Sequence, residues 1–329
     1  MAIGKGSDFA INDEYVKTRI NELLAQNGEA FGTASNGAMR LSTRSILGNY
    51  EYSSFFANLG STLTARRDLT SVTSQTDTAL TQAQNISVKL NRKMIPVAQT
   101  RDAFRKVFGQ FSATEFSGIV AEQYANAMQL EMLNSSLAAA ANALKQQTAS
   151  YVTESSLGSI STNSLFTSLA AMGDRADRVV CWVMHSKVYY DLVKSQTSAN
   201  ITGVSNFTVA TATPITCNRP VLVTDSASLL ANLNSPDVQD YYTLGLTADA
   251  VNVENTEDQE IVVQDVTGLE NLVIRIQGEY AYNLSLKGFK WDVSNGGANP
   301  SDANVALGTN WDVAQTSVKN RAGICLMTL

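Results

Sequence analysis

One stretch of the sequence constrains the fold more than any other, because residues 113–147 lack strong helix breakers. They contain no proline, and Gly118 is their only glycine, which predicts one continuous helix. Ser112 and Glu115 have the spacing of a capping box, in which two side chains bind the first free backbone N–H groups of a helix. At roughly 1.5 Å per residue, this helix is about 50 Å long. The fold therefore has to accommodate a rod longer than a compact small domain is wide.

The composition of this rod indicates what it packs against. Beyond its first turn only three residues are charged, so the charged flanks of a coiled coil are missing. Its second half contains the small-residue tract SSLAAAANAL. The pattern favours a helix that lies along a sheet. The predicted apolar stripe consists of Phe116, Val120, Tyr124, Ala127 and Leu130.

A matching strand is predicted over residues 272–286. Apolar and polar residues alternate over most of this segment, as expected of a strand with one buried and one hydrated face. Gly278 interrupts the apolar face, which indicates a bulge or a close backbone approach. The long helix and this strand together predict an α+β fold with an antiparallel sheet.

The segment before the long helix is polar and contains few apolar residues. Residues 61–100 are rich in Ser, Thr and Gln, with alternating segments at Leu69–Thr73 and Ile86–Leu90. They predict a long two-stranded excursion, and an isolated hairpin is marginally stable in water. We therefore expect it to lie against a neighbouring subunit. Ahead of it, Tyr15–Gln26 predicts a short amphipathic helix with Asn12 or Asp13 as its cap, and residues 32–60 an irregular arm.

Charge is distributed in two opposed blocks. Residues 36–110 hold ten Lys or Arg against four acids, whereas residues 241–270 hold seven acids and no base. Two interpretations remain open: the blocks attract copies of the same chain to one another, or they are separate solvated faces. With a net charge of -6 and no basic stripe interleaved with aromatic residues, sequence-specific nucleic acid binding is not expected.

The only histidine, His185, follows Cys181 by four residues. Residues 178–184 predict a buried strand, in which positions 181 and 185 would be about 13 Å apart. A Cys/His hydrolase needs hydrogen-bond contact between the two groups and a third group that orients the base. A kink after the strand would be required to bring them together, with Asp191 as the orienting group. A hydrolase therefore stays a distant alternative.

The simpler interpretation makes Cys181 a core residue and Ser186 the cap of a helix over Lys187–Lys194. The other cysteines, Cys217 and Cys325, are scattered and form no CxxC pair. We expect no metal site, no cofactor and no catalytic residue. No apolar run approaches about 18 residues, so no membrane span is expected, and the N-terminus lacks the apolar stretch of a secretory signal.

The order of elements resembles the major capsid protein of tailed double-stranded DNA bacteriophages, which has the Hong Kong 97 fold. The similarity is carried by a series of segments spread over nearly the whole chain and not by one motif. After the N-terminal arm and the long helix from Ser112, the similar segments are VKLNRKMIPVAQTRDAFRKVFG, RVVCWVMHSKVYYDLVKS, NRPVLVTDSASL, LKGFKWDV and DVAQTSVKNRAGICLM.

This resemblance implies a division of the chain into parts. An N-terminal arm precedes an extended loop that lies over the adjacent subunit. The long helix is the spine of a peripheral domain, and an axial domain gathers around local symmetry axes. The expected boundaries are 1–49 for the arm, 50–99 for the loop, 100–150 with 266–329 for the peripheral domain, and 151–265 for the axial domain.

The resemblance also implies a function. A shell protein of this kind assembles as hexamers and pentamers into an icosahedral head that encloses packaged double-stranded DNA without sequence-specific binding. It is not an enzyme. It is made in the host cytoplasm and resides in the virion capsid, with portal and scaffolding proteins and possible decoration proteins as partners. The related alternative is an encapsulin-like shell around enzyme cargo.

Candidate contacts between subunits follow from the loop and the acidic block. Some members of the family cross-link a loop lysine to a neighbour's asparagine, and Lys89 or Lys93 is the candidate here. Loop bases are expected to meet acidic residues on the adjacent subunit. The candidate bases are Arg66, Arg67, Lys89, Arg92 and Lys93, and the candidate acids are Glu257 and Asp258.

Overall fold

The structure is a computed structural model of the 329-residue chain. It describes residues 16–26, 32–56, 59, 63–108, 113–153, 158–201, 216–231 and 239–329. Asn12, Asp13 and Ser112, which were predicted as helix caps, lie outside these ranges.

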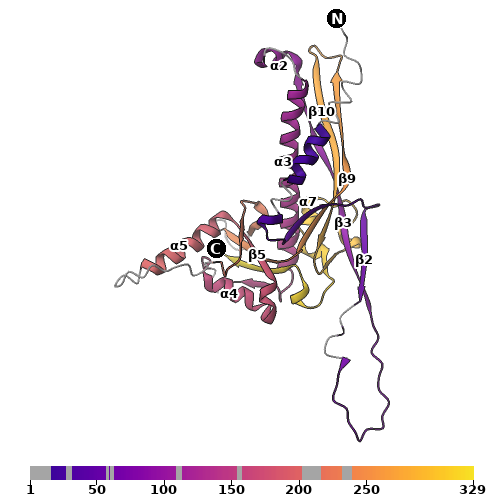
Figure 1. Cartoon of the computed structure of the whole chain (residues 1–329), viewed down its shortest axis with the longest axis vertical. Helices are drawn as coiled ribbons and strands as arrows, with labels where there is room; N and C mark the ends of the chain where they lie inside the picture. Colours follow the sequence, from indigo (N-terminus) through magenta and orange to yellow (C-terminus); the bar gives the residue numbers. More distant parts are fainter. Residues whose placement is uncertain are drawn as a thin grey trace.

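The long helix α3, Ala113–Lys145, lies along a five-stranded sheet, as the sequence predicts (Figure 1). The long strand β10 is antiparallel to β9 on one side and to β3 on the other. We call this sheet the long sheet. Its order is β1-β9-β10-β3-β2, with β1 Met39–Thr43, β2 Tyr50–Phe56, β3 Gln82–Thr100, β9 Val251–Val266 and β10 Val273–Leu286.

Strand β10 confirms the predicted alternation in its first half only. Ile274 and Ile276 are fully buried, while Arg275 and Gln277 are exposed. The register shifts between Ile276 and Gly278, and a Cβ on Gly278 would come within 2.7 Å of the Glu260 carbonyl oxygen. The prediction of a hydrated polar face is wrong in the second half, where Asn283 is fully buried because neighbouring segments cover both faces.

The face that α3 buries differs from the predicted stripe. Val120 and Tyr124 are buried as predicted, but Leu130 is 58% exposed and Ala127 is exposed. The buried row continues through Met128 and Met132, because residues four apart lie above one another on a helix. The side chain of Phe116 lies outside the described part. The small residues of the second half are buried on nearly every side, which permits close packing of the surrounding elements.

The extended loop is paired differently from the prediction. Leu69–Thr73 forms no strand. Strand β3 pairs with β2 on the edge that faces away from β10. The expected irregular arm, residues 32–60, thus contains two strands, β1 and β2. Strand β1 pairs with β9 in parallel. Residues 63–81 are exposed and contain no strand, because their mostly polar sequence has too little apolar surface to form a core. They extend away from the body at the lower end in Figure 1.

The N-terminal amphipathic helix is confirmed over residues 16–26. Val16 and Ile20 are fully buried in the same cluster as the first half of α3 and the inner face of β10. The burial of this apolar face, and not helix propensity, stabilises such a short helix.

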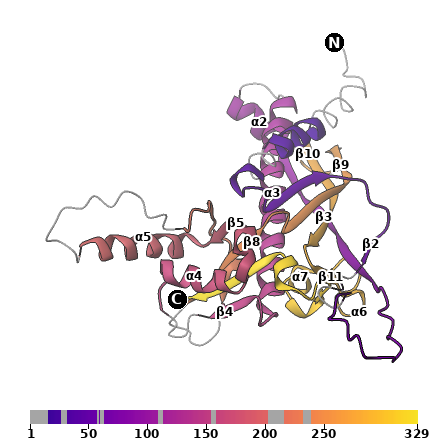
Figure 2. The same ribbon diagram turned by 60° about the horizontal axis from the view of Figure 1, so that its bottom comes forward.

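A second sheet forms the other lobe, flanked by α4 and α5 (Figure 2). The predicted strand at 178–184 is present as Val179–Met184. The order is β4-β13-β8-β5-β6, and β7 also pairs with β8. The bounds are β4 Tyr151–Thr153, α4 Thr162–Ala170, β5 Val179–Met184, α5 Ser186–Ile201, β6 Val221–Val223, β7 Leu230–Ala231, β8 Asp240–Thr247 and β13 Gly323–Thr328.

The sheets divide the chain differently from the expected domain boundaries at two places. Strand β9, expected in the axial part, belongs to the long sheet, and the C-terminal β13 belongs to the second sheet. Short elements surround a packed Trp291–Trp311 pair: β11 Phe289–Trp291, α6 Val293–Gly296, α7 Asp302–Val305 and β12 Trp311–Val313. Helix α2, Arg101–Phe108, follows β3 at the upper end of the long sheet in Figure 1. Within the described residues, none of the helices has the length and apolar character of a membrane span.

Candidate assembly interface

The root of the extended loop is held by charged groups of its own chain. The Lys89 side chain, only 6% exposed, donates to the Glu257 carboxylate and lies 3.5 Å from the Ile46 carbonyl oxygen. Glu257 is 57% exposed. The structure thus joins within one chain two residues that were expected to meet between subunits.

A second group of charges lies beside this pair. Arg44 pairs with Glu51 and is 3.5 Å from a Glu254 carboxylate oxygen. The buried amide of Asn283 donates to Glu254 at 3.1 Å. These contacts connect β2, β9 and β10 with the segment after β1, so they fix the base of the loop.

Arg92 forms a junction between three further elements. Its guanidinium lies 2.9 Å from Glu131 of α3 and 2.5 Å from Asp302 of α7, and above the Tyr282 ring of β10. Burial alone lowers the pKa of Arg92, but Tyr282, Asp302 and Glu131 together raise it above its ordinary value. Arg92 therefore stays charged and holds β3 to the spine helix.

The remaining candidate residues have other surroundings. Lys93 is exposed on the face of the long sheet opposite α3 and lies directly across from Glu279. The side chain of Asp258 lies outside the described part of the chain. Arg66 and Arg67 are exposed in the loop, and within the described residues neither forms an ion pair.

The tip of the extended loop, residues 63–81, also exposes apolar side chains. Leu69 is 83% exposed and Val72 is fully exposed. Local order comes from Asp68, whose carboxylate accepts the backbone N–H of Thr70 at 2.9 Å and its hydroxyl at 2.7 Å. The tip carries two arginines and several apolar groups that the described part of the chain does not cover.

The Cys/His hydrolase constellation is not assembled. Burial raises the pKa of the Cys181 thiol to about 11, which opposes formation of the nucleophilic thiolate. The predicted orienting group, Asp191, pairs with Lys187 at 3.0 Å. His185 faces Asp225 at 3.7 Å instead. The cysteine, the histidine and the carboxylate that a thiol hydrolase would need therefore do not form one connected group.

The cap of α5 also differs from the prediction. Nδ1 of His185, and not the Ser186 hydroxyl, accepts the backbone N–H of Lys187 at 3.2 Å. The His185 carbonyl oxygen accepts the N–H of Tyr189 at 3.0 Å. His185 is thus the residue that ends the strand and caps the helix, which gives the only histidine a structural role.

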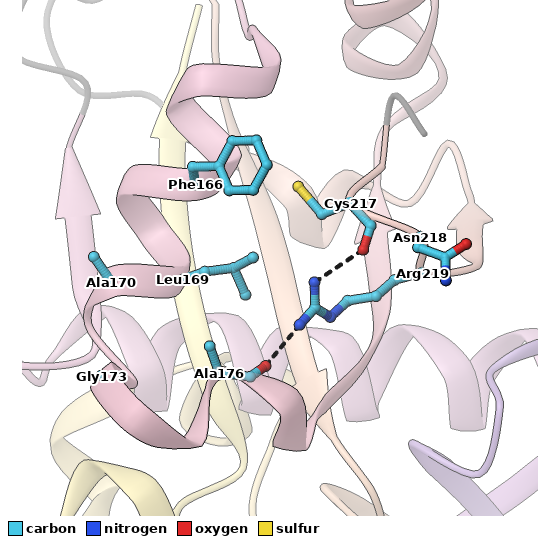
Figure 3. A pocket seen from close by; sticks show the side chains of 8 residues that line it. All are labelled: Phe166, Leu169, Ala170, Gly173, Ala176, Cys217, Asn218 and Arg219. Carbon is cyan, nitrogen blue, oxygen red and sulfur yellow. Dashed lines mark hydrogen bonds between the residues drawn. The ribbon is translucent and has the colours of Figure 1, made fainter. Parts of the chain in front are cut away.

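The second lobe has a shallow hollow of about 470 Å³ beside α4 (Figure 3). Arg219 directs its guanidinium to the Ala176, Cys217 and Val179 carbonyl oxygens, so it is committed to backbone contacts. Burial raises the pKa of Cys217. The lining residues are Phe166, Leu169, Ala170, Gly173, Ala176, Cys217, Asn218 and Arg219. Among the described residues, no three His, Cys, Asp or Glu side chains lie close enough to hold a metal ion.

Several charged contacts were not predicted. Arg101 binds both carboxylate oxygens of Asp265, at 2.5 and 2.6 Å, and a signal was present because these residues lie in the two opposed charge blocks. The pairs of Arg44 with Glu254 and of Lys89 with Glu257 also join the blocks. Part of the opposed charge is therefore neutralised within the chain. Nothing in the sequence identifies Asp302 as a partner of Arg92.

Comparison with known proteins places this geometry in context. Residues 8–325 match the model of a family described as Gp13-like, major capsid protein 13-like. A search of curated proteins found no significant match.

Solved structures with a similar fold come from phage capsids. A structure of Mycobacterium phage Bobi has a TM-score of 0.53 at 11% identity, covering 90% of each chain. The acidic stable capsid of Helicobacter pylori bacteriophage KHP30 has a TM-score of 0.52 at 10% identity, covering 90% of this chain and 89% of that one. The head of Helicobacter pylori bacteriophage KHP40 has a TM-score of 0.51 at 9% identity, covering 88% of each chain. At these identities the likeness shows the shared fold.

Proposed function

The chain belongs to the Gp13-like family of major capsid proteins, and from this membership we propose that it assembles as hexamers and pentamers into an icosahedral head around double-stranded DNA. It is a structural shell protein of a tailed-phage head and a component of the virion capsid. The finer claims, the capsomer types and the enclosed genome, form the proposal.

The tip of the extended loop is the observation that supports this proposal most strongly. Residues 63–81 expose Arg66, Arg67, Leu69 and Val72, and no described part of the chain covers these side chains. Exposed apolar groups next to exposed charges are typical of an interaction site. A shell in which every loop lies over the adjacent subunit would cover all of these groups by the same contact.

The root of the loop supports the same arrangement. Lys89 and Arg92 anchor β3 to β9, α3 and α7, so the loop leaves a fixed base. A fixed base lowers the conformational entropy that docking would cost. If a lysine of this loop is cross-linked to a neighbour's asparagine, Lys93 is the exposed candidate, because the amine of Lys89 is buried against Glu257.

The division into domains belongs to this proposal as well. We assign the lobe built on the second sheet to the local symmetry axes and the lobe built on α3 and the long sheet to the periphery. We also propose synthesis in the host cytoplasm, with portal and scaffolding proteins, and a possible decoration protein, as partners.

The test is sedimentation of the full chain, alone and with a co-expressed scaffold, with negative-stain microscopy of the fast fraction. Closed icosahedral particles are the expected result. A persistent monomer under every condition would contradict the proposal. The content of particles from infected cells separates a genome shell from an enzyme-filled compartment, because nuclease-protected DNA is expected in the first and protein cargo in the second.

The hydrolase alternative has its own control. Cys181→Ser retains a small side chain at a buried position, and a shell protein should assemble with this variant as it does with the native chain. Loss of a hydrolytic turnover in this variant, with assembly unaffected, would identify a second activity.

A further inference from the structure

A cavity of about 370 Å³ lies where the long sheet meets the second lobe, and we call it the junction cavity. One wall is formed by β2 and β3 at the root of the extended loop. The other walls come from the residue before β5, the turn after β10 and the segment between β12 and β13. Its lining includes Ser53, Ser54, Asn85, Arg178, Lys287 and Asn320. A molecule bound in this cavity would contact both lobes.

The junction cavity is positively charged. Among the described residues that line it, Arg178 and Lys287 are cations and none is acidic. Neither cation forms an ion pair with a described residue. Burial lowers the pKa of Lys287; Asp249 opposes this shift, and Arg178 adds to it. The charge of Arg178 therefore acts on Lys287, and an anion between the two side chains would offset their repulsion.

Both cations are held in position by neutral acceptors. Nη1 of Arg178 donates to the Lys319 carbonyl oxygen and to Oδ1 of Asn320, both at 2.9 Å. Nζ of Lys287 donates to the Ala248 carbonyl oxygen at 2.6 Å. Nε and Nη2 of Arg178 donate to no acceptor in the described part of the chain, and an ammonium group has further N–H donors besides the one used here. The two charges are therefore positioned but not neutralised.

The wall formed by the root of the loop adds further donors. Strand β2 is an edge strand of the long sheet, so alternate backbone N–H groups of β2 face away from the sheet. Ser53 and Ser54 of this strand line the cavity, and their hydroxyl groups can also donate. Donor groups therefore come from both lobes.

The donors and the size of the cavity indicate the class of ligand. Arginine, lysine and backbone N–H groups are typical donors to phosphate. A phosphate group also offers more acceptor oxygens than a carboxylate, so it matches donors that come from several elements. The volume of about 370 Å³ lies near the lower end of the range for small-molecule pockets. The space therefore suits a small oxyanion and not a helix or strand of another chain.

We propose that the junction cavity binds a phosphate group between Arg178 and Lys287. This inference goes beyond the shell function and does not depend on assembly, because the lining residues belong to one chain. The bound group would connect the root of the extended loop to the second lobe and so restrain their relative position. Its two sources are free phosphate and the sugar–phosphate backbone of a nucleic acid.

The main experiment is isothermal titration calorimetry of the unassembled full chain with inorganic phosphate, at an ionic strength held constant with chloride. The native chain is expected to show saturable binding. Lys287→Gln removes one charge at an exposed position, and its phosphate affinity is expected to be weaker by about tenfold or more. Lys290→Gln is the matched control, because Lys290 lies nearby in β11, outside the cavity, and faces Asp312 at 3.6 Å. Its phosphate affinity should equal that of the native chain.

A second measurement uses the unfolding midpoint of the same proteins. A ligand that binds only the folded chain stabilises it. Inorganic phosphate is therefore expected to raise the midpoint of the native chain and of Lys290→Gln, but not that of Lys287→Gln. Arg178→Gln should also lose the response to phosphate. Because Arg178 contacts Asn320, circular dichroism has to show that this variant folds, and Lys287→Gln carries the test if it does not.

Competition distinguishes the two sources of the phosphate group. A short DNA duplex is added to the native chain in the presence of inorganic phosphate, again at constant ionic strength. Displacement of phosphate by the duplex would assign the cavity to the backbone of a nucleic acid. Retention of phosphate would assign it to the free anion.

Two results would overturn the inference: equal phosphate affinities of the native chain and Lys287→Gln, or no saturable binding by the native chain. If the native chain binds no phosphate while Lys287→Gln lowers the yield of closed particles, the cavity receives a carboxylate of a second copy, and the inference is also overturned. Particle formation by the native chain is measured separately, so each of these results leaves the shell function to its own test.

Discussion

The root and the tip of the extended loop carry the same kind of charge in opposite surroundings. At the root, Lys89 and Arg92 are each held by carboxylates of their own chain. At the tip, Arg66 and Arg67 are exposed without an ion pair among the described residues. The difference shows that basic residues of one sequence block serve two purposes: those at the root fix the hairpin, and those at the tip remain available to another molecule.

The physical cause of the difference is the amount of apolar surface near each charge. Val88 and Leu90, on either side of Lys89, are buried. This part of β3 therefore belongs to the core, where a charged group must be paired. The tip has too little apolar surface to form its own core and stays in solvent. The following changes test this contrast in the unassembled full chain, from the largest expected effect to the smallest.

The largest effect is expected from Lys89→Glu. A carboxylate at this buried position would lie against Glu257 without a cation, which we expect to destabilise the fold by about 3 kcal/mol or more. The matched variant Lys89→Met keeps the apolar stem, and Glu257 is 57% exposed, so its carboxylate can be hydrated. We expect Lys89→Met to change the free energy of unfolding by less than about 1 kcal/mol. The measurement is urea unfolding of both variants. Equal losses of unfolding free energy would contradict the pairing of Lys89 with Glu257.

The second-largest loss of stability is expected from Arg92→Ala. This change leaves Glu131 and Asp302 next to each other without their common cation, and it removes the contact with the Tyr282 ring. Because Asp302 is 70% exposed, solvent reduces the loss, which we expect to be about 2 kcal/mol by urea unfolding. Asp302→Ala leaves Glu131 as a partner of Arg92 and is expected to cost less than about 1 kcal/mol. A larger loss for Asp302→Ala than for Arg92→Ala would argue against a junction centred on Arg92.

A small effect on folding is expected from the double change Arg66→Ala with Arg67→Ala. Both side chains are exposed, so the free energy of unfolding should change by less than about 0.5 kcal/mol. Particle assembly of the same variant should decrease strongly. A variant that loses stability in the unassembled chain would show that the tip, like the root, contributes to its own fold.

The smallest effect concerns the turn at Asp68. The backbone N–H of Thr70, followed by its hydroxyl, lowers the pKa of Asp68 below the usual value for this side chain. The carboxylate therefore stabilises the turn above the unfolded pKa of about 3.9, and this contribution is lost as the pH falls through the lower folded pKa. Carboxyl-carbon NMR should show a lowered Asp68 midpoint, and Thr70→Ala should raise it. An unshifted titration midpoint of Asp68 in the native chain would contradict its hydrogen bonds with Thr70.

The sequence predicted those elements whose pattern is local and strong. The helix over α3 follows from the absence of breakers in 113–147, and the first half of β10 follows from its alternation. The buried strand before His185 was also predictable, because a short apolar run rich in β-branched residues has few alternatives. The resemblance added the order of these elements and hence the α+β capsid fold, which the family match and the similar structures confirm.

The residues that hold the root together could be predicted only in part. Opposed charge blocks indicated that bases and acids meet, but not whether they meet within a chain. Arg101 with Asp265 and Lys89 with Glu257 are separated by long stretches of sequence, and only the register of β3, β10 and β9 brings them together. Likewise, the stripe on α3 was predicted correctly at Val120 and Tyr124 and wrongly at Ala127 and Leu130, because the rotation of the helix depends on the sheet beneath it.

The sequence by itself therefore determined a long rod, an alternating strand, a polar loop and two opposed charge blocks, since each depends on neighbours within a few residues. Only the tertiary structure decided which charges are paired and which remain exposed. The pairing of β10 between β9 and β3 places Glu279 next to Glu260 and Lys93, although these residues are far apart in the chain. Strand register is fixed by the burial of the shared apolar face, and the exposed face, with its row of charges, is a consequence of that burial.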